Sequence, residues 1–181
     1  MDPAPGDSRH DPAVGSAAGS AVGSTVGSAQ GPRTFSWDFQ VRFIDLNASG
    51  HLDNLQILLA VDEARHRLLG VGEPGAAPLL VGLLADAPAH VATLVAAHRV
   101  EYRRELWFAA APLDITLWVC RVGGSSFDVA TEVRQSPAEP IAAVAVTTVV
   151  VVDTTIGSPW PLSAPVRAAL TAYLGPAPTL R

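Results

Sequence analysis

The chain has 181 residues, of which 49% are hydrophobic and 16% charged, and its formal net charge is −5. This length and composition suit one folded domain with a core of ordinary size. The 12 basic residues, all arginine, form no basic run, and the apolar run at 141–152 is too short to cross a bilayer, so we expect neither nucleic acid nor a membrane as a partner. The single cysteine excludes an intrachain disulfide and points to the cytoplasm.

The N-terminal segment, residues 1–32, is of low complexity, with a Gly-Ser pair at every fourth position of GSAAGSAVGSTVGS. It has too few large apolar residues to bury a core and no continuous apolar segment typical of a secretory signal. We therefore expect a disordered tail at 1–32, a folded domain at 33–175 and a short C-terminal tail at 176–181.

The folded domain opens with a strand, a polar turn and a long helix. Aromatic and apolar residues alternate with polar ones, which predicts a half-buried strand over 35–43. The turn DLNASGH follows at 45–51. Leucines at helical spacing then predict a helix over 52–69, with Asp62 on its otherwise apolar face. Asp53 or Asn54 caps the start of this helix, and Gly70 ends it.

The rest of the chain reads mainly as sheet. A loop is expected at 71–78, and the stretch 79–85 fits either a short helix or a strand. Four strands follow, joined between the second and third by a turn at Gly123-Gly124, and a helix at 163–174 closes the domain. The strands are predicted at 91–106, 113–119, 127–133 and 141–153. The element order indicates an α+β domain whose antiparallel sheet wraps around one long central helix.

The junction between the first strand and the helix is the chemically interesting place. The first backbone N–H groups of a helix have no partner inside the helix, and they lie at the positive end of its macrodipole. Such N–H groups polarise a carbonyl that lies against the helix start. A polar turn at this point therefore suggests a site for an acyl group.

The run VRFIDLNASGHLDN at 41–54, followed by DEAR at 62–65, resembles the signature of hotdog-fold acyl-CoA thioesterases of the 4-hydroxybenzoyl-CoA thioesterase type. Their usual form is R-(Y/F)-x-D-x-D-x-x-G-H-V-N-N followed by E-x-A-R, and the likeness extends over about residues 35–170. The resemblance implies a hotdog fold, hydrolysis of an acyl-CoA or acyl-carrier-protein thioester, and a homodimer or a dimer of dimers. It implies no cofactor apart from the coenzyme A or phosphopantetheine of the substrate.

One departure from the family pattern falls at the catalytic position. The second acid of D-x-D is the family's catalytic carboxylate, and the matching residue here is Asn47. An amide has no useful basicity near neutral pH, so Asn47 does not replace an aspartate as a base. Asp45 matches the first acid, whose family role is structural. On a period-two strand it faces the same side as Asn47 and could reach the substrate through a water.

Two hotdog lineages suggest how hydrolysis continues without that acid. The thioesterases of enediyne polyketide pathways resemble this chain in having Asn at this position with Arg eighteen residues later, where Arg65 stands here. Asn47 then holds the water, and the alternative for Arg65 is a structural ion pair. A second lineage has its acid eight positions after the residue whose N–H polarises the carbonyl, and acts across the dimer interface. If that residue is Asn54, the acid is Asp62. The alternative role for Asp62 is structural, in a salt bridge with Arg65 or His66.

A third alternative changes the reaction. Asp45, Asn47 and His51 resemble the D-x-N-P-x-H pattern of (R)-specific enoyl-CoA hydratases, which share the fold. The proline is absent and the histidine comes one residue late, so the Gly50-His51 pair fits the thioesterase pattern better. The alternative for His51 is a loop residue that shapes the pocket.

The remaining polar residues suggest how the thioester is held. Arg99, Arg103 and Arg104 lie close together on a predicted strand, where they could meet phosphates. Ser125 and Ser126 belong to the predicted hairpin turn and are expected at the pocket mouth. No metal is expected, because the histidines lack metal-ligand spacing. The sequence thus predicts an acyl-thioester hydrolase; the alternatives are a non-catalytic acyl-thioester-binding protein and, third, a hydratase.

Overall fold

The computed structural model of the protein describes residues 32–70 and 81–181. The expected loop at 71–78 lies outside these ranges, as does the expected tail at 1–32 apart from its last residue. The start of the ambiguous stretch 79–85 also lies outside them. Its described part, 81–85, forms neither a helix nor a strand and contains turns.

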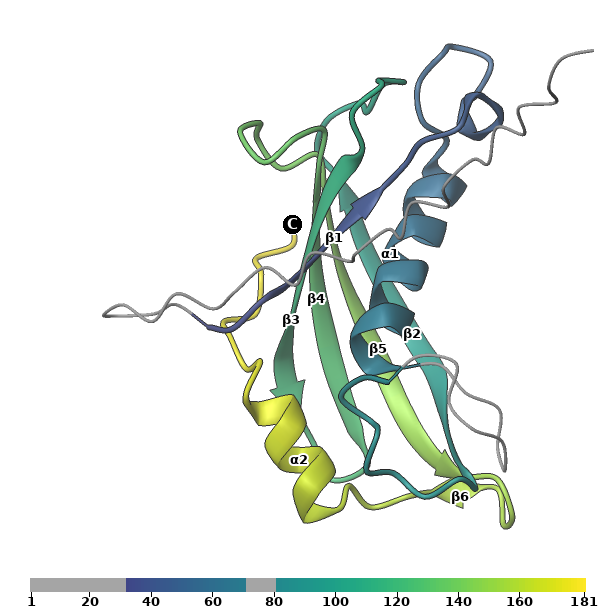
Figure 1. Ribbon diagram of the computed structural model, residues 1–181, viewed down its shortest axis with the longest axis vertical. Coiled ribbons are helices and arrows are strands. Elements are labelled where there is room, and N and C mark those ends of the chain that lie inside the picture. The colour runs from purple at the N-terminus through teal and green to yellow at the C-terminus, as the bar shows by residue number, and fades with distance from the viewer. Residues whose placement is uncertain (1–31, 71–80) are drawn as a thin grey trace, which may run out of the picture.

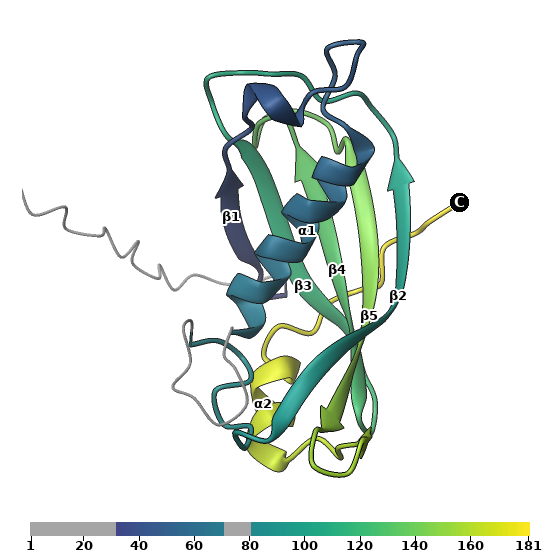
Figure 2. The ribbon, with the colours of Figure 1, turned by 90° about the vertical axis from the view of Figure 1, so that its right-hand side faces the viewer.

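A six-stranded antiparallel sheet forms one layer of the domain, in the order β1-β3-β4-β5-β2, with the short β6 paired to β5. A long helix, α1, crosses one face of this sheet (Figures 1 and 2). The expected α+β arrangement is therefore present. The elements in chain order are β1 (Phe35–Phe39), α1 (Asn54–Leu69), β2 (Val91–Tyr102), β3 (Leu113–Val122), β4 (Ser126–Arg134), β5 (Ala143–Asp153), β6 (Ser158–Pro159) and α2 (Ala164–Thr171).

The core lies between α1 and the sheet. The helix contributes small and medium apolar residues, which lets the strands approach closely, and the strands contribute every second residue because side chains alternate between faces. The fully buried members include Ala60, Val61, Ala64, Leu113, Ile115, Leu117, Phe127, Val129, Val133 and Val149. At about 25 cal/mol per Å² of apolar surface, this layer is the main source of stability.

The sheet covers a different face of α1 from the leucine face that the sequence predicts to be buried. Ile57, Val61 and Leu68 face the core, whereas Leu55 is 73% exposed and Leu59 is 42% exposed. The helix has apolar residues on two faces, and spacing alone does not say which one the sheet covers. Its ends agree with expectation, because the Asp53 carboxylate accepts the Leu55 N–H at 2.8 Å and Gly70 ends the helix with φ 97°.

The first strand is shorter than predicted. It ends at Phe39, and residues Phe43–Asp45 form a 3₁₀ turn in which Phe43 is 81% exposed. The Asp45 side chain closes this turn by accepting the Arg42 backbone N–H at 2.7 Å. The expectation that Asp45 and Asn47 face the same side of a strand is therefore wrong.

Several other boundaries also shift. The strand expected over 91–106 ends at Tyr102, the last long strand begins at Ala143, and the closing helix spans Ala164–Thr171. The short β6 was not predicted. The turn at Gly123-Gly124 between β3 and β4 is confirmed, with the Gly123 N–H bonded to the Ser126 carbonyl. Among the described residues, none of the helices is long and apolar enough to cross a membrane.

Candidate functional site

Asn47 organises the loop that leads into α1. Its side-chain oxygen accepts the backbone N–H groups of Ser49 at 2.9 Å and His51 at 3.2 Å. Its backbone carbonyl accepts the Gly50 N–H at 3.0 Å, and Gly50 has φ 80°, a conformation that other residues rarely adopt. Because two N–H donors face Oδ1, the side-chain NH₂ group is the part of Asn47 left for a ligand.

Most backbone N–H groups at this junction are already used. The N–H of His51 donates to the Asn47 side chain, and Leu52 and Asp53 donate to the carbonyls of Leu106 at 2.8 Å and Asp45 at 3.0 Å. The N–H of Asn54 has no acceptor within the described part of the chain. Of the backbone N–H groups at 51–54, it is the one left to polarise a carbonyl.

The segment that follows β2 forms the wall of the site opposite this loop. The His51 ring meets the Trp107 ring edge-on at a centroid distance of 4.1 Å, and His51 Nδ1 lies 3.3 Å from Glu105 Oε1. The Tyr102 hydroxyl donates to the Asn54 carbonyl at 3.3 Å. Burial, and then the nearby Asp53 carboxylate, raise the pKa of Tyr102, which keeps the phenol neutral.

Sequence reasoning did not single out Tyr102, Glu105 or Trp107 as site residues. The available signal was the run of polar and aromatic residues at the end of a predicted strand and just beyond it, EYRRELWF at 101–108. The pairing of His51 with Trp107 in an isolated bridge brings this run against the turn. Such a long-range contact does not show in local spacing.

Asp45 does not line the site. Its side chain is fully buried and is held by the Arg42 guanidinium at 2.8 Å, in addition to the Arg42 backbone. The hydrogen bond from the Arg42 side chain holds the pKa of Asp45 below its usual value, although burial opposes the shift. The substrate-binding role predicted for Asp45 is therefore wrong. Asp45 bonds to Arg42 and the His51 ring lies against Trp107, so the two side chains that a hydratase would pair have different partners here.

Asp62 and Arg65 lie farther along α1 and bond to each other. Arg65 is buried and its guanidinium donates to the Asp62 carboxylate, which also lies 3.5 Å from His66 Nδ1. Eight residues of helix place Asp62 about 12 Å from Asn54 along the axis. Within one protomer, both residues are thus outside the Asn47 loop, and the ion pair named as the alternative is present.

Residues 41–170 match the family model of the thioesterase-like superfamily. The chain belongs to the thioesterase-like superfamily. The resemblance drawn from the sequence is thereby confirmed, as is the α+β hotdog fold. Among curated proteins, none matches this chain.

Solved structures of thioesterases share the fold of this thioesterase-like chain. A predicted thioesterase from Bacillus stearothermophilus has a TM-score of 0.66 at 15% identity, covering 81% of this chain and 100% of its own. A 1,4-dihydroxy-2-naphthoyl-CoA thioesterase from Synechocystis has a TM-score of 0.59 at 17% identity, covering 77% and 96%. A thioesterase from Thermus thermophilus, complexed with coenzyme A and Zn, has a TM-score of 0.57 at 23% identity, covering 76% and 92%.

Ser125 and Ser126 lie at the opposite end of the sheet from the site of this thioesterase-like chain. Leu113, the first residue of β3, pairs with Phe39 beside the Asn47 loop, whereas Val122 at the other end of β3 leads into the serines. Nine residues of strand separate these ends by about 30 Å. Within one protomer, the serines therefore do not line the pocket that the turn was expected to border.

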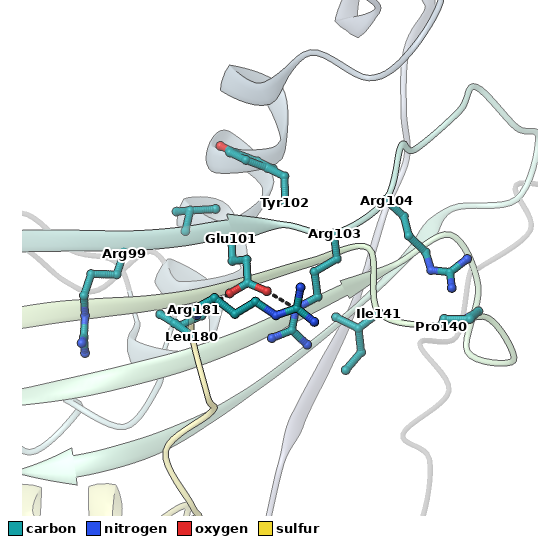
Figure 3. A pocket seen from close by; sticks show the side chains of 10 residues that line it. Arg99, Glu101, Tyr102, Arg103, Arg104, Pro140, Ile141, Leu180 and Arg181 are labelled. Atoms are coloured by element: carbon teal, nitrogen blue, oxygen red, sulfur yellow. Dashed lines mark hydrogen bonds and ion pairs between the residues drawn. The ribbon is translucent and has the colours of Figure 1, made fainter.

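Arg103 and Arg104 point to different places. Arg104 lines a hollow of about 710 Å³ together with Glu105 and Trp107, so it adjoins the site. Arg103 bonds to Glu101 at 2.7 Å on the other face of β2, away from Tyr102 (Figure 3). Among the described residues, no three His, Cys, Asp or Glu side chains are placed to hold a metal ion.

Proposed function

We propose that this protein hydrolyses an acyl thioester at the start of α1. The observation that carries the proposal is the Asn54 N–H, which has no acceptor among the described residues and lies at the positive end of a long helix in a thioesterase-like chain. The thioester oxygen accepts this N–H, and the macrodipole stabilises the negative charge that develops when water attacks. Water oxygen bonds to the carbonyl carbon, the C–S bond breaks, and the thiolate leaves and takes up a proton.

Asn47 acts as a hydrogen-bond donor in this mechanism. Its oxygen already accepts two backbone N–H groups, so its NH₂ group faces the ligand. It orients the attacking water or the thioester, and it takes no proton. A separate group must therefore be the base.

We assign the base to the partner subunit's Asp62 in a homodimer. The edge strand β2 supports such a dimer, because Leu94 is 56% exposed there and a second copy can continue the sheet. Leu55 and Leu59 on the uncovered face of α1 add apolar surface on the same side as Asp62. A pair of dimers remains a further expectation.

The thioester arrives on coenzyme A or on a carrier protein. The solved thioesterases named above include one whose substrate is a coenzyme A thioester and one complexed with coenzyme A, which supports this substrate class here. Arg104 stands beside Trp107 at the entrance and suits a phosphate of the carrier.

A protein that binds acyl thioesters without turning them over is the second candidate. It is favoured by the amide at position 47 and by the engagement of Asp62 with Arg65 and His66. In this case the helix terminus still binds the carbonyl, and no base is present to activate water.

The two candidates separate in one experiment. Purified protein is incubated with acyl-CoA and acyl-carrier thioesters of several chain lengths, and free thiol is measured, with hydration of crotonyl-CoA followed in parallel. The proposal predicts thiol release and no hydration. Calorimetric binding of the same thioesters without thiol release would assign the protein to the binding class.

A further inference from the structure

The C-terminal segment of residues 173–181, here called the C-terminal strap, crosses the outer face of the sheet, opposite α1 (Figures 1 and 2). It begins beside β3, where the Val119 N–H donates to the Tyr173 carbonyl at 3.0 Å and the Gly175 N–H donates to Val119 at 2.8 Å. The Trp118 indole N–H then donates to the Pro176 carbonyl at 2.8 Å. A Cβ added to Gly175 would lie 2.8 Å from the Trp118 ring, so the strap fits closely.

The strap ends against β2. Residues 99 and 101 of this strand share its outer face with residue 103, which directly follows the strand, because side chains alternate. There the Glu101 carboxylate accepts the Arg103 Nε–H at 2.7 Å and the Arg181 backbone N–H at 2.8 Å. The Arg103 guanidinium also donates to the Thr179 carbonyl at 2.9 Å. Figure 3 shows Glu101 between Arg103 and Arg181.

An open groove of about 950 Å³ lies beside these contacts. Four arginines line it and Glu101 lies among them, although the whole chain has a net charge of −5. The arginines are Arg99, Arg103, Arg104 and Arg181, and the carboxylate is Glu101. Hydrogen bonds from the Arg181 backbone, and then from Arg103, hold the pKa of Glu101 below its usual value, so it stays charged and keeps both partners in place.

We propose that the C-terminal strap forms one wall of an anion-binding groove, and that a nucleotide polyphosphate bound there holds the strap in place. Guanidinium groups recognise phosphate oxygens in pairs, and four of them suit a ligand with several phosphates. The ligand class, the 3′-phosphorylated adenosine diphosphate end of coenzyme A, rests on the proposed function. By linkage, a ligand that contacts Arg181 stabilises the docked strap.

Calorimetry of the full-length protein with adenosine 3′-phosphate 5′-diphosphate tests the groove without any thioester. Arg103→Gln and Arg181→Gln each remove one guanidinium and are expected to weaken binding about tenfold. Arg167→Gln, on the exposed surface of α2 and outside the groove, removes the same charge and is expected to leave binding unchanged. Inorganic pyrophosphate is titrated alongside, and we expect it to bind more weakly than the nucleotide.

Hydrogen exchange of residues 173–181 tests the strap itself. At a ligand concentration near the Kd of the unmodified protein, the ligand should slow exchange of these amides in the unmodified protein and in Arg167→Gln, and should have little effect in Arg181→Gln. Equal affinity of Arg181→Gln and the unmodified protein would overturn the proposal, and so would an unchanged affinity of Arg103→Gln. Binding that depends on Arg181 in a protein that hydrolyses no thioester would uphold the groove and reject the proposed hydrolysis. Hydrolysis without nucleotide binding would uphold the proposed hydrolysis and reject the groove.

Discussion

The side-chain oxygen of Asn47 accepts the backbone N–H of His51 at 3.2 Å and so fixes the turn that leads into α1. An aspartate in the same place could accept the same bond, so the loop itself does not require an amide. The amide differs from a carboxylate at its second terminal atom, where an NH₂ donor stands in place of an oxygen acceptor. The chemistry of the candidate site, and not the loop conformation, is therefore the property that distinguishes Asn47 from an aspartate.

Replacing Asn47 separates these two contributions. In Asn47→Asp the loop bonds persist and the donor is lost, so we expect kcat to fall by about tenfold while the melting temperature changes little. Asn47→Ala should lower both kcat and the melting temperature, because the His51 and Ser49 N–H groups lose their acceptor. A rise in kcat in Asn47→Asp would contradict the donor role and show that a carboxylate at position 47 is the better catalyst.

Asp53 caps the helix that carries the site. Removal of its carboxylate in Asp53→Ala leaves the Leu55 N–H without its acceptor, and the free energy of unfolding should fall by about 1 kcal/mol. Urea denaturation measures this change. Asp86→Ala, at an exposed turn position, is the matched control and should stay within about 0.5 kcal/mol of the unmodified protein. Equal losses in both variants would argue against the cap.

The Asp45–Arg42 pair predicts a dependence of stability on pH. Because the pKa of Asp45 is held below the usual 3.8, the pair stabilises the fold above that pH, and this stability is lost as the pH falls through the lowered pKa. Asp45→Asn lacks the charge, so its deficit at neutral pH, about 1–3 kcal/mol, should shrink in acid. Unfolding curves at a series of pH values measure the difference. A deficit that stays constant down to the lowest pH would contradict the ion pair.

The proposed dimer, formed through the exposed edge of β2, should break when a charge is introduced at that edge. Leu94→Lys should convert the protein to a monomer in sedimentation velocity, because two lysines would meet at a two-fold pairing of β2 strands. Ile156→Lys changes a residue that is 72% exposed in a turn outside that edge, and it should leave the association state unchanged. A dimer that survives Leu94→Lys would assign the interface to another surface.

Local patterns predicted most of the fold. Period-two alternation located β3 and β4, the continuous apolar run located β5, and Asp53 and Gly70 marked the ends of α1. The predicted first strand is too long, because Val41 continues its alternation and is buried although it lies outside the strand. The hydrogen bonds of Asp45 that form the 3₁₀ turn are specific side-chain geometry, which periodicity does not report.

The site was predicted only in part. The loop residues Asn47 and Gly50 and the helix start at Asn54 were found because they are adjacent in the sequence. Tyr102 and Trp107 were missed, because they reach the helix terminus through the pairing of distant segments. The crossing of the sheet by the C-terminal strap also depends on such contacts.

A mixing experiment between two variants of the full-length protein tests whether the catalytic site is shared between protomers. Asn47→Ala should lower thiol release by about 10-fold to 100-fold, and Asp62→Asn by about 100-fold or more. Circular dichroism and sedimentation first establish that both variants fold and dimerise. If each site combines Asn47 with the partner subunit's Asp62, equal amounts of the two variants, exchanged to equilibrium, should recover about a quarter of the unmodified activity, because mixed dimers hold one intact site. Activity that stays at the average of the two separate variants would contradict a catalytic site shared between protomers.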